Sequence, residues 1–361
     1  MLIQLALTGL LVALLPLSIV LTSNDTDKYR KLIAITLFLT FDLVMFGAFT
    51  RLTDSGLGCP DWPGCYGQAN PIQAHAEIRA AETLMPTGPV TVSKAWIEMI
   101  HRYLAMAVGV LIIAIMIVAW RKWLKSSRHL SSYSPGLPTA LFLLVCLQGA
   151  FGAWTVTMKL QPIIVTIHLL LGLALLGLLA TLAARHSVQT SVASTARTLF
   201  IPALFALSLL MVQIVLGGWV STNYAVLACT DFPLCHGELI PPMDFEHSFT
   251  LWRELGKTTT GELLPVESLT AIHWIHRNFA FIVIGVIAWL AIRAYKIEGL
   301  HKTGKWILLG LALQFASGVS TIYLSWPIAI AILHNGGAAL LVLLLIVLIY
   351  KARFAPLKEQ N

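Results

Sequence analysis

Charged residues are scarce in this chain. Asp, Glu, Lys and Arg together make up 11% of its 361 residues, whereas an average soluble domain carries about 25%. Hydrophobic residues account for 57%, and the mean hydropathy is +0.80. This composition excludes an ordinary soluble globular domain and indicates a protein that crosses a membrane several times.

Acidic residues are the rarer kind of charge, yet the net charge of +7 does not indicate a nucleic-acid partner, because the basic residues are sorted along the chain. Of the 24 Lys and Arg, 16 lie in the short segments 23–31, 121–138, 185–198, 293–305 and 351–361. The alternate connections hold 6 of them, together with 11 of the 17 acids. Lys and Arg stay on the cytoplasmic side of a membrane. We therefore expect a cytoplasmic C-terminus and outer loops at 51–95 and 221–271.

The N-terminal segment lacks a charged leader and a small-residue cleavage site. Segment 2–22 could be read as a signal peptide. Because it lacks these features, we expect instead a retained transmembrane helix with its N-terminus outside. No mitochondrial presequence is visible, which favours a bacterial inner membrane.

Long apolar runs are what the chain has in abundance. Nine of them approach the roughly 20 residues that a helix needs to cross a bilayer. They occupy residues 2–22, 32–50, 96–120, 139–157, 163–184, 199–220, 272–295, 306–325 and 327–350. The expected fold class is an all-α polytopic membrane protein with nine spans. Membrane lipid is therefore an expected partner of these helices.

Cysteine is also rare, with five residues in all. Cys59 and Cys65 lie in the first outer loop, and Cys229 and Cys235 lie in the second. The outer compartment is oxidising, so disulfides persist there. Cys146 lies within an apolar run and is expected to be a small buried residue.

The two cysteine loops belong to a tandem repeat. "GCPDWPGCYG" at 58–67 returns as "ACTDFPLCHG" at 228–237, so an offset of 170 residues aligns Cys59 with Cys229. Further matches are "MIHRYLA" at 99–105 with "WIHRNFA" at 274–280, and "LQGAFGAWT" at 147–155 with "LQFASGVST" at 313–321.

The repeat predicts two tandem four-helix bundles, 32–190 and 191–361. Each half contains an even number of spans, so both halves enter the membrane in the same sense and are related by a pseudo-two-fold axis along the membrane normal. Residues 1–31 supply one extra N-terminal transmembrane helix and a cytoplasmic linker outside the repeat.

Four histidines lie at similar depth within these spans: His101 and His168 in the first half, His276 and His334 in the second. At 1.5 Å per residue, all four are roughly 6–10 Å inside the outer boundary. A lone intramembrane histidine is commonly a hydrogen-bonded packing residue. Two at matching height on different helices suit the two faces of a haem iron. Zinc needs three or four converging ligands, which two separate pairs fit less well.

The two halves differ three residues before the first histidine, on the same helical face. The first half has Glu98 ("EMIH") and the second has His273 ("HWIH"). A carboxylic acid facing only one pocket suggests that this pocket does chemistry, with Glu98 as proton donor or acceptor, while the other holds a redox cofactor. The alternative is that Glu98 only pairs with Arg102 at the outer rim.

Arg102 and Arg277 directly follow two of the histidines. Each has two candidate roles: paired hydrogen bonds to haem propionates, or extension toward lipid headgroups. Arg51 is a further candidate propionate contact specific to the first half, because Ser221 stands at its repeat position. Asp42 lies in mid-span and receives no role.

The run "GAFTRLTDSGLGCPDWPGCYG", the "EMIHR" and "HWIHR" helix starts, and the doubled cysteine loops over four histidines resemble the haem A synthase family. The resemblance covers about residues 32–350. It implies two four-helix halves, a haem b cofactor, and an oxidoreductase that converts the C8 methyl of haem O to a formyl group. The product is haem A for cytochrome c oxidase.

The resemblance also implies site residues. His276 and His334 are expected to hold the iron of haem b, and His101 and His168 that of the substrate haem. The family's pocket glutamate falls on Glu98. The loop cysteines correspond to the pairs Cys59–Cys65 and Cys229–Cys235, which close the outer ends of the pockets either as structural disulfides or, in the first pair, as thiols active during transfer of haem O.

The segment 2–22 departs from the family pattern, because it precedes the part of the chain that resembles the family.

The expected partners are haem O, a haem O synthase that delivers it and an unidentified electron carrier. The chain could also form a homo-oligomer. The acidic, turn-rich loop 238–268 either covers the second pocket as a lid or docks a partner.

Three other functions remain as alternatives. A membrane disulfide oxidoreductase explains the cysteine loops but not the four histidines. A di-haem b electron-transfer cytochrome explains the histidines but not Glu98. A haem transporter or chaperone predicts that one haem exchanges without being modified.

Overall fold

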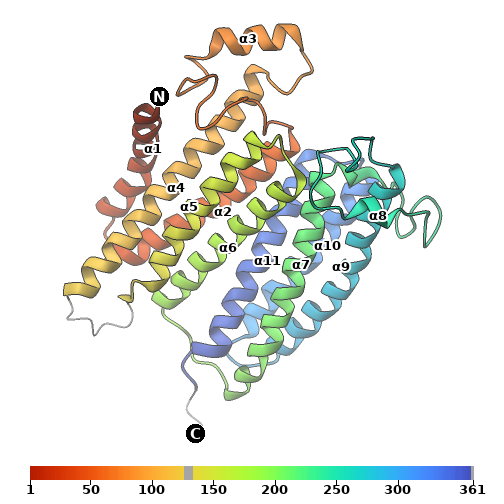
Figure 1. Cartoon of the computed structure of the whole chain (residues 1–361). Helices are drawn as coiled ribbons and strands as arrows, with labels where there is room; N and C mark the ends of the chain where they lie inside the picture. The colour runs from red at the N-terminus through yellow and green to blue at the C-terminus, as the bar shows by residue number, and fades with distance from the viewer. Residues whose placement is uncertain (126–132, 359–361) are drawn as a thin grey trace. The chain divides into compact units, whose positions relative to one another are not determined.

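The structure is a computed structural model that describes residues 1–125 and 133–358. Arg128, which belongs to the basic segment 121–138, lies outside the described residues. Regular secondary structure in this part of the chain is helical, with isolated bridges only. Nine helices in the described residues are long and apolar enough to cross a membrane (Figure 1), which confirms the predicted class. They are α1 (Leu2–Thr22), α2 (Lys28–Leu52), α4 (Val92–Lys125), α5 (Gly136–Thr157), α6 (Pro162–His186), α7 (Phe200–Thr222, preceded by the 3₁₀ turn Ser194–Leu199), α9 (Val266–Tyr295), α10 (His301–Tyr323) and α11 (Ile328–Phe354).

Two helices begin well before their predicted apolar runs. α4 starts at Val92 and α9 at Val266, because the polar residues of their first turns still favour helix outside the apolar layer. His101 and His276 are consequently the tenth and eleventh residues of these helices. Both histidines thus lie about 15 Å along the helix from its first residue.

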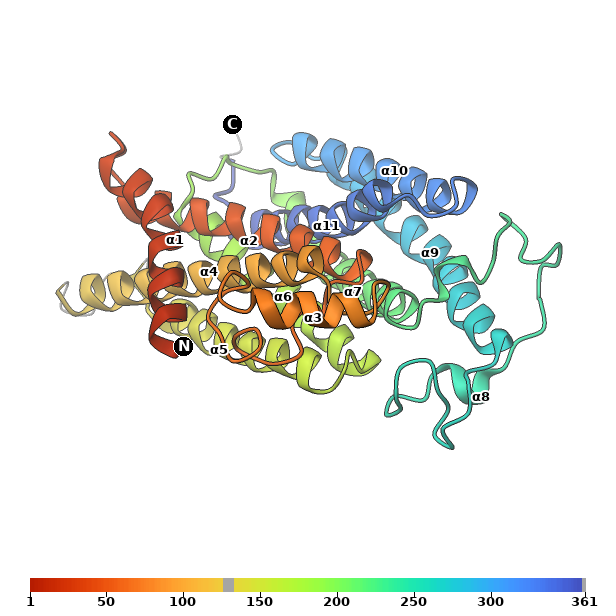
Figure 2. The ribbon, with the colours of Figure 1, turned by 90° about the horizontal axis from the view of Figure 1, so that it is seen from above.

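The first compact unit comprises residues 1–160 and 174–187. α2 and α5 pack against α4, and the second part of α6 completes this core. Its fully buried side chains include Ile33, Leu111, Ile112, Ile115, Leu141 and Leu179. α1 crosses α4 at Gly9 (Figure 2), where an added Cβ would lie 2.9 Å from the Cβ of Met106. This close approach of a small residue attaches the helix that lies outside the repeat.

The second unit comprises residues 161–173 and 188–358. Its helices α7, α9, α10 and α11 form a closed ring of contacts in which α7 packs on α9 and α11, and α10 packs on the same two helices. Arg197 fastens one end of the ring, since its guanidinium donates to the carbonyls of Ala352 and Ala355 at 2.7 Å each. The units divide within α6 after residue 173 and again after residue 187. The predicted repeat domains, 32–190 and 191–361, stay a prediction.

The segments 53–91 and 223–265, between the long apolar helices, contain two helices that the sequence did not indicate, α3 (His75–Leu84) and α8 (Phe245–Ser248). α3 is anchored by Ile78, which is 1% exposed. The segment around α8 is held to the bundle, because Nε1 of Trp219 on α7 donates to the carbonyl of Ser248 at 2.8 Å. Arg253, only 4% exposed, donates to the side-chain oxygen of Asn223 at the end of α7.

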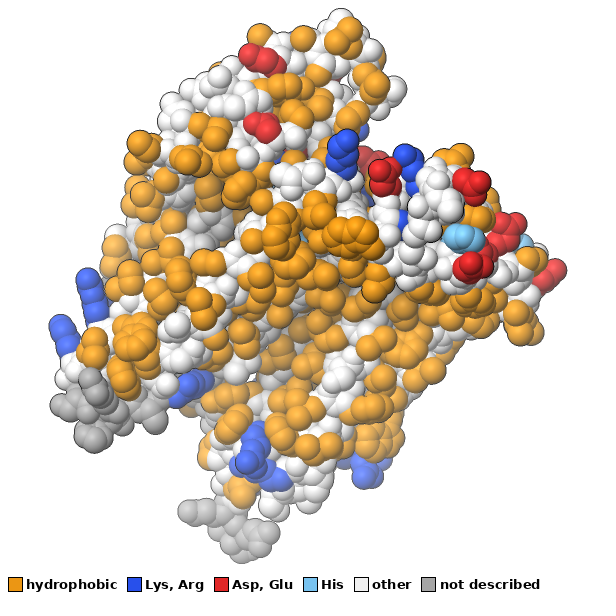
Figure 3. Space-filling model, viewed as in Figure 1, with side chains coloured by type: hydrophobic (Ala, Val, Ile, Leu, Met, Phe, Trp, Pro, Cys, Tyr) orange, Lys and Arg blue, Asp and Glu red, His pale blue; other side chains and the backbone are white. Residues whose placement is uncertain are grey.

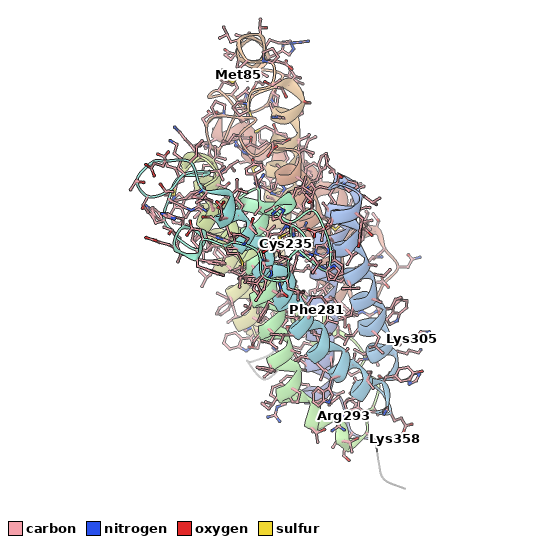
Figure 4. All side chains as sticks on the ribbon, turned by 90° about the vertical axis from the view of Figure 1, so that its right-hand side faces the viewer. Met85, Cys235, Phe281, Arg293, Lys305 and Lys358 are labelled. Atoms are coloured by element: carbon pink, nitrogen blue, oxygen red, sulfur yellow. A yellow bond between two sulfur atoms is a disulfide. The ribbon has the colours of Figure 1, made fainter. Side chains whose placement is uncertain are left out.

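Hydrophobic side chains cover much of the helical surface in the view of Figure 3. Cys146 on α5 contributes to this kind of surface: it is exposed, so the prediction that it is buried was wrong. An apolar residue of a membrane helix has lipid as well as protein to face. In the second unit, Arg293, Lys305 and Lys358 lie away from the loop that carries Cys235 (Figure 4), as the sorting of charge predicts for opposite membrane faces.

Candidate functional site

The two cysteine loops have the same local structure. Cys59–Cys65 and Cys229–Cys235 are both disulfide-bonded, with 4.9 Å between the Cα atoms of each pair. In each loop the second cysteine exchanges two backbone hydrogen bonds with the residue three positions further on, at 2.9–3.1 Å. A cis X-Pro peptide lies inside each loop. The sequence repeat is therefore reproduced in the backbone of the loops.

An aspartate inside each loop, Asp61 or Asp231, accepts hydrogen bonds through both carboxylate oxygens. The donors are the backbone N–H groups of Tyr66 and Gly67 in the first loop and of His236 and Gly237 in the second, at 2.6–2.9 Å. The hydrogen bond from Gly237 is the main reason that the pKa of Asp231 lies below its usual value, and the charge of Arg277 acts in the same direction.

Each loop is also held by an arginine. Arg102 on α4 and Arg277 on α9 donate to backbone carbonyls within the loop of their own half. The acceptors are Asp61, Pro63 and Gly64 for Arg102, at 2.6–3.2 Å, and Asp231 and Leu234 for Arg277, at 2.8 and 3.1 Å. These bonds give both arginines a structural task that sequence reasoning missed, and their contact with propionates stays a prediction.

Glu98 contacts the first loop from α4. Its Oε2 accepts a hydrogen bond from the backbone N–H of Cys59 at 2.8 Å, and its Oε1 accepts one from Nη2 of Arg102. In the second half, Nδ1 of His273 accepts from the backbone N–H of Cys229 at 3.2 Å. The residue three positions before the histidine thus touches the first cysteine of the loop in both halves.

The exchange of Glu98 for His273 changes the surroundings of the arginine that follows. Arg102 forms an ion pair with Glu98, and both side chains are largely buried. Arg277 has a histidine at the corresponding position, and its Nη1 is buried without a hydrogen-bond partner in the described part of the chain. The guanidinium of Arg277 therefore keeps a donor available for an anion.

His276 on α9 is held by two residues of α7. Nε2 of Gln213 lies 3.1 Å from Nδ1 of His276 and donates to its backbone carbonyl at 3.0 Å. One turn later, Gly217 leaves room for the ring, because an added Cβ would lie 2.9 Å from Cε1 of His276. The second nitrogen of the imidazole, Nε2, is the one that remains for a metal.

His334 on α11 is held in a similar way by α10. Oγ of Ser317 lies 2.9 Å from Nδ1 of His334 and 3.0 Å from the carbonyl of Gln314. The amide of Gln314 lies 3.3 Å from Nε2 of His334. Gly318 leaves room for this ring, since an added Cβ would lie 3.0 Å from its Cε1.

The first-half histidines belong to different units. His101 lies against α2, where an added Cβ at Gly47 would be 3.1 Å from its Cε1 and where the ring of Phe46 is stacked with it at 6.2 Å. His168 is the seventh residue of α6, as His334 is of α11, and belongs to the part of α6 grouped with the second unit. The pairing of His101 with His168 stays a prediction.

Two other residues singled out in the sequence lie on α2. Arg51 forms an ion pair with Asp54 at 3.1 Å. Asp42 is exposed on the helix surface. The contact of Arg51 with a propionate stays a prediction, and Asp42 stays without an assigned role.

The second pair fits a haem. His276 on α9 and His334 on α11 come from two helices that both pack on α7 and α10. Two imidazoles are a donor set for haem iron, the glycines leave space at both rings, and the buried Nη1 of Arg277 suits a propionate. Within the described residues, no three His, Cys, Asp or Glu side chains converge as they would to hold a bare metal ion.

Comparison with known proteins supplies a family. Residues 30–346 match the COX15-CtaA family, described as cytochrome oxidase assembly protein. A heme A synthase of Shewanella oneidensis is 41% identical over 322 residues, which cover 88% of this chain and 95% of the relative. A heme A synthase of Mesorhizobium japonicum is 30% identical over 332 residues, with 86% of each chain covered. One of a Chelativorans species is 28% identical over 321 residues, with 82% of this chain and 83% of the relative covered.

Proposed function

Because the chain belongs to the COX15-CtaA family of cytochrome oxidase assembly proteins, we propose that it is a haem A synthase. It acts as an oxidoreductase on the C8 methyl of haem O and produces haem A for cytochrome c oxidase. The relatives that carry the name heme A synthase support this directly, since the alignments run over most of both chains.

The two halves have different tasks in this proposal. His276 and His334 hold a resident haem b, and Arg277 binds one of its propionates through the buried Nη1. Haem b, when bound, supplies one-electron redox chemistry. His101 and His168 hold the iron of haem O, the substrate, which enters from the lipid phase because it is too apolar to cross water.

The reaction removes four electrons and four protons in two rounds. In the first, oxidation at the methyl carbon and attack of water give the alcohol. In the second, the alcohol is oxidised in the same way to a gem-diol, which loses one water to give the aldehyde. Each round releases two protons, so the pocket needs an acid–base group within reach of the reacting carbon.

Glu98 is the residue that we assign to this proton transfer. Its side chain is 5% exposed, so bulk water does not compete for its protons. The backbone N–H of Cys59 and the guanidinium of Arg102 fix both carboxylate oxygens. Arg51 and Arg102 stay candidate contacts for the substrate's propionates. The disulfide Cys59–Cys65 holds the loop that covers Glu98, and Cys229–Cys235 does the same over His273.

We further propose the setting of the enzyme. It lies in the inner membrane of a bacterium as a multi-pass protein, with a cytoplasmic C-terminus and both cysteine loops on the periplasmic side. A haem O synthase supplies the substrate, and an electron carrier takes up the electrons. The sorting of Lys and Arg along the chain supports this orientation.

The observation that carries the proposal is the second-half histidine pair, seated against Gly217 and Gly318 in a chain that aligns over nearly its whole length with heme A synthases. The test is extraction of haem from the purified protein, with separation by chromatography and identification by mass. Haem B together with haem O or haem A is expected. Haem B alone in two equivalents would favour a di-haem cytochrome. One haem that exchanges without being modified would favour a haem carrier. Absence of any haem would favour a disulfide oxidoreductase.

A further inference from the structure

α1 lies wholly outside the family match, which begins at residue 30. Its buried residues recur every three or four positions and so form one face of the helix. They are Leu5, Gly9, Ala13, Pro16 and Val20. α1 packs on α4 and α2, and most of its other positions are exposed. Whatever α1 contributes to the first unit is therefore made through this one face.

The first turn of α1 lies against the first cysteine loop (Figure 1). Sδ of Met1 is beside Gly64, because an added Cβ at Gly64 would lie 2.7 Å from it. Leu5, one turn later, is 4% exposed and belongs to a buried cluster that includes both Cys59 and Cys65. A helix that precedes the repeat thus packs against the surroundings of the first disulfide.

The two cysteine loops differ at the point that Met1 contacts. The offset of 170 residues aligns Gly64 with Leu234, which is half-buried in the second loop. A side chain at position 64 would meet Sδ of Met1 and the backbone carbonyl of Gln68. The first loop therefore has no side chain of its own at this point, and the side chain of Met1 lies there instead.

We propose that the N-terminal end of α1 is a cover for the first cysteine loop, which keeps the Cys59–Cys65 disulfide from exchanging with external thiols. Exchange requires that a thiolate reach one of the two sulfur atoms. Both cysteines are fully buried, so a thiol reaches them only when the loop or its cover opens. The first disulfide is consequently a structural bond for as long as α1 stays in place.

The covered loop is the one that contacts Glu98. The carbonyl of Gly64, the residue beside Met1, accepts a hydrogen bond from Nη1 of Arg102 at 2.6 Å, and Arg102 pairs with Glu98. The backbone N–H of Cys59 donates to the same carboxylate at 2.8 Å. Reduction of the disulfide would remove one constraint from this loop. α1 therefore protects the surroundings of Glu98, whichever reaction the site performs.

The middle of α1 determines how closely the cover is held. At Gly9 an added Cβ would lie 2.9 Å from Cβ of Met106 on α4. Small residues of this kind allow two membrane helices to pack closely. A large side chain at this position would push α1 away from α4 and move Leu5 away from the loop, without changing any residue of the loop itself.

The test compares the rates at which the two disulfides are reduced in the full-length protein in detergent. Free thiols are first blocked with maleimide. Dithiothreitol is then added, samples are quenched with acid at intervals, and the new thiols are labelled with a second maleimide after the reagent is removed. Mass spectrometry of the peptides follows Cys59–Cys65 and Cys229–Cys235 in the same sample. The second pair is the internal reference, because it belongs to the second unit.

Two variants weaken the cover in different ways. Leu5→Ala removes a buried side chain, and Gly9→Leu displaces the helix. Each should speed the reduction of Cys59–Cys65 by about tenfold or more and leave that of Cys229–Cys235 unchanged. Leu7→Ala is the matched control, because it makes the same substitution on the same helix at a residue that is 53% exposed. Both of its rates should equal those of the wild type.

Three results would overturn the inference. The first is an equal rate for Cys59–Cys65 in the wild type, Leu5→Ala and Gly9→Leu. The second is faster reduction of both pairs to the same extent, because α1 would then support the whole protein and not the first loop. The third is loss of residues 1–22 from the purified protein, which its intact mass reveals. Absence of haem from the same sample would instead overturn the proposed function, since the reduction rates do not depend on haem.

Discussion

Glu98 is joined to Cys59, because its Oε2 accepts the backbone N–H of that cysteine at 2.8 Å. The candidate catalytic acid and the first disulfide loop are therefore parts of one structure. The second half repeats the contact with a different chemistry, since His273 accepts the backbone N–H of Cys229. A neutral imidazole there keeps the loop in place without the carboxylate that the first half uses.

Replacement of Glu98 by Gln tests its role in proton transfer separately from its role as a hydrogen-bond acceptor. Glu98→Gln keeps an oxygen for Cys59 but cannot transfer a proton, so conversion of haem O is expected to fall by about 100-fold or more. The protein should still fold and still bind haem b. Chromatography of haems from cells that supply haem O measures this. Normal accumulation of haem A in Glu98→Ala would remove the residue from the mechanism.

Removal of each disulfide tests whether the cysteines act chemically. Closing a loop of this size should contribute about 2–3 kcal/mol through the entropy of the unfolded chain. The double variants Cys59→Ser/Cys65→Ser and Cys229→Ser/Cys235→Ser are expected to lower thermal stability to a similar extent and to retain conversion of haem O at a temperature where both are folded. Loss of conversion confined to the first double variant would assign thiol chemistry to Cys59 and Cys65.

The glycines beside the histidines offer a test of the haem site that replaces no candidate ligand. In Gly217→Ala the new methyl would lie 2.9 Å from Cε1 of His276, so the ring must shift and bound haem b should decrease. Gly285→Ala on α9 is the control, because an added Cβ there meets nothing within 4 Å. The control should be as stable as the wild type, or up to about 1 kcal/mol more stable. Equal haem content in the two variants would contradict the site.

Substitutions of Arg102 and Arg277 can serve as controls for each other. Arg102→Gln and Arg277→Gln both remove hydrogen bonds to a cysteine loop. Of the two arginines, Arg277 has a buried Nη1 without a hydrogen-bond partner among the described residues. Its replacement should therefore weaken haem b binding by about tenfold or more. Titration of haem into haem-depleted protein measures the difference. Similar affinities in both variants would restrict Arg277 to holding the loop.

The second loop is expected to weaken in acid. Hydrogen bonds from the backbone N–H groups of Gly237 and His236 place the pKa of folded Asp231 below that of the unfolded chain. The resulting stabilisation is complete above the unfolded value, near 4, and is lost as the pH falls through the folded value. Asp231→Asn should therefore lower the melting temperature at pH 7, and the difference from the wild type should be smaller at about pH 2. An equal difference at both pH values would contradict this.

Much of the fold follows from the sequence because hydropathy and length alone identify a membrane span. All nine expected runs are helices, and their bounds differ by a few residues. The four histidines, Glu98 and both cysteine pairs were also found in the sequence, since charged or polar groups stand out in apolar runs. α3 was missed because it lies in a polar loop, because Ile78 is the only residue of α3 that is buried, and because no long apolar run marks the helix.

The contacts of the site could not be derived in this way. Gln213 and His276 are distant in sequence, and their hydrogen bond depends on how α7 and α9 are rotated toward each other. Hydropathy does not report that rotation in a membrane, because residues that face lipid are as apolar as residues that face the core. Cys146 was misplaced for the same reason.

The sequence by itself determined the number of spans, the repeat and the residues able to ligate a haem, because each is a matter of composition and spacing. The tertiary structure decided which neighbours those residues have. It placed Gln213 and Ser317 at the imidazoles of His276 and His334. Over residues 1–125 and 133–358, it gave the buried Nη1 of Arg277 no hydrogen-bond partner. These are properties of side-chain positions across helix interfaces, which exist only when the helices are packed.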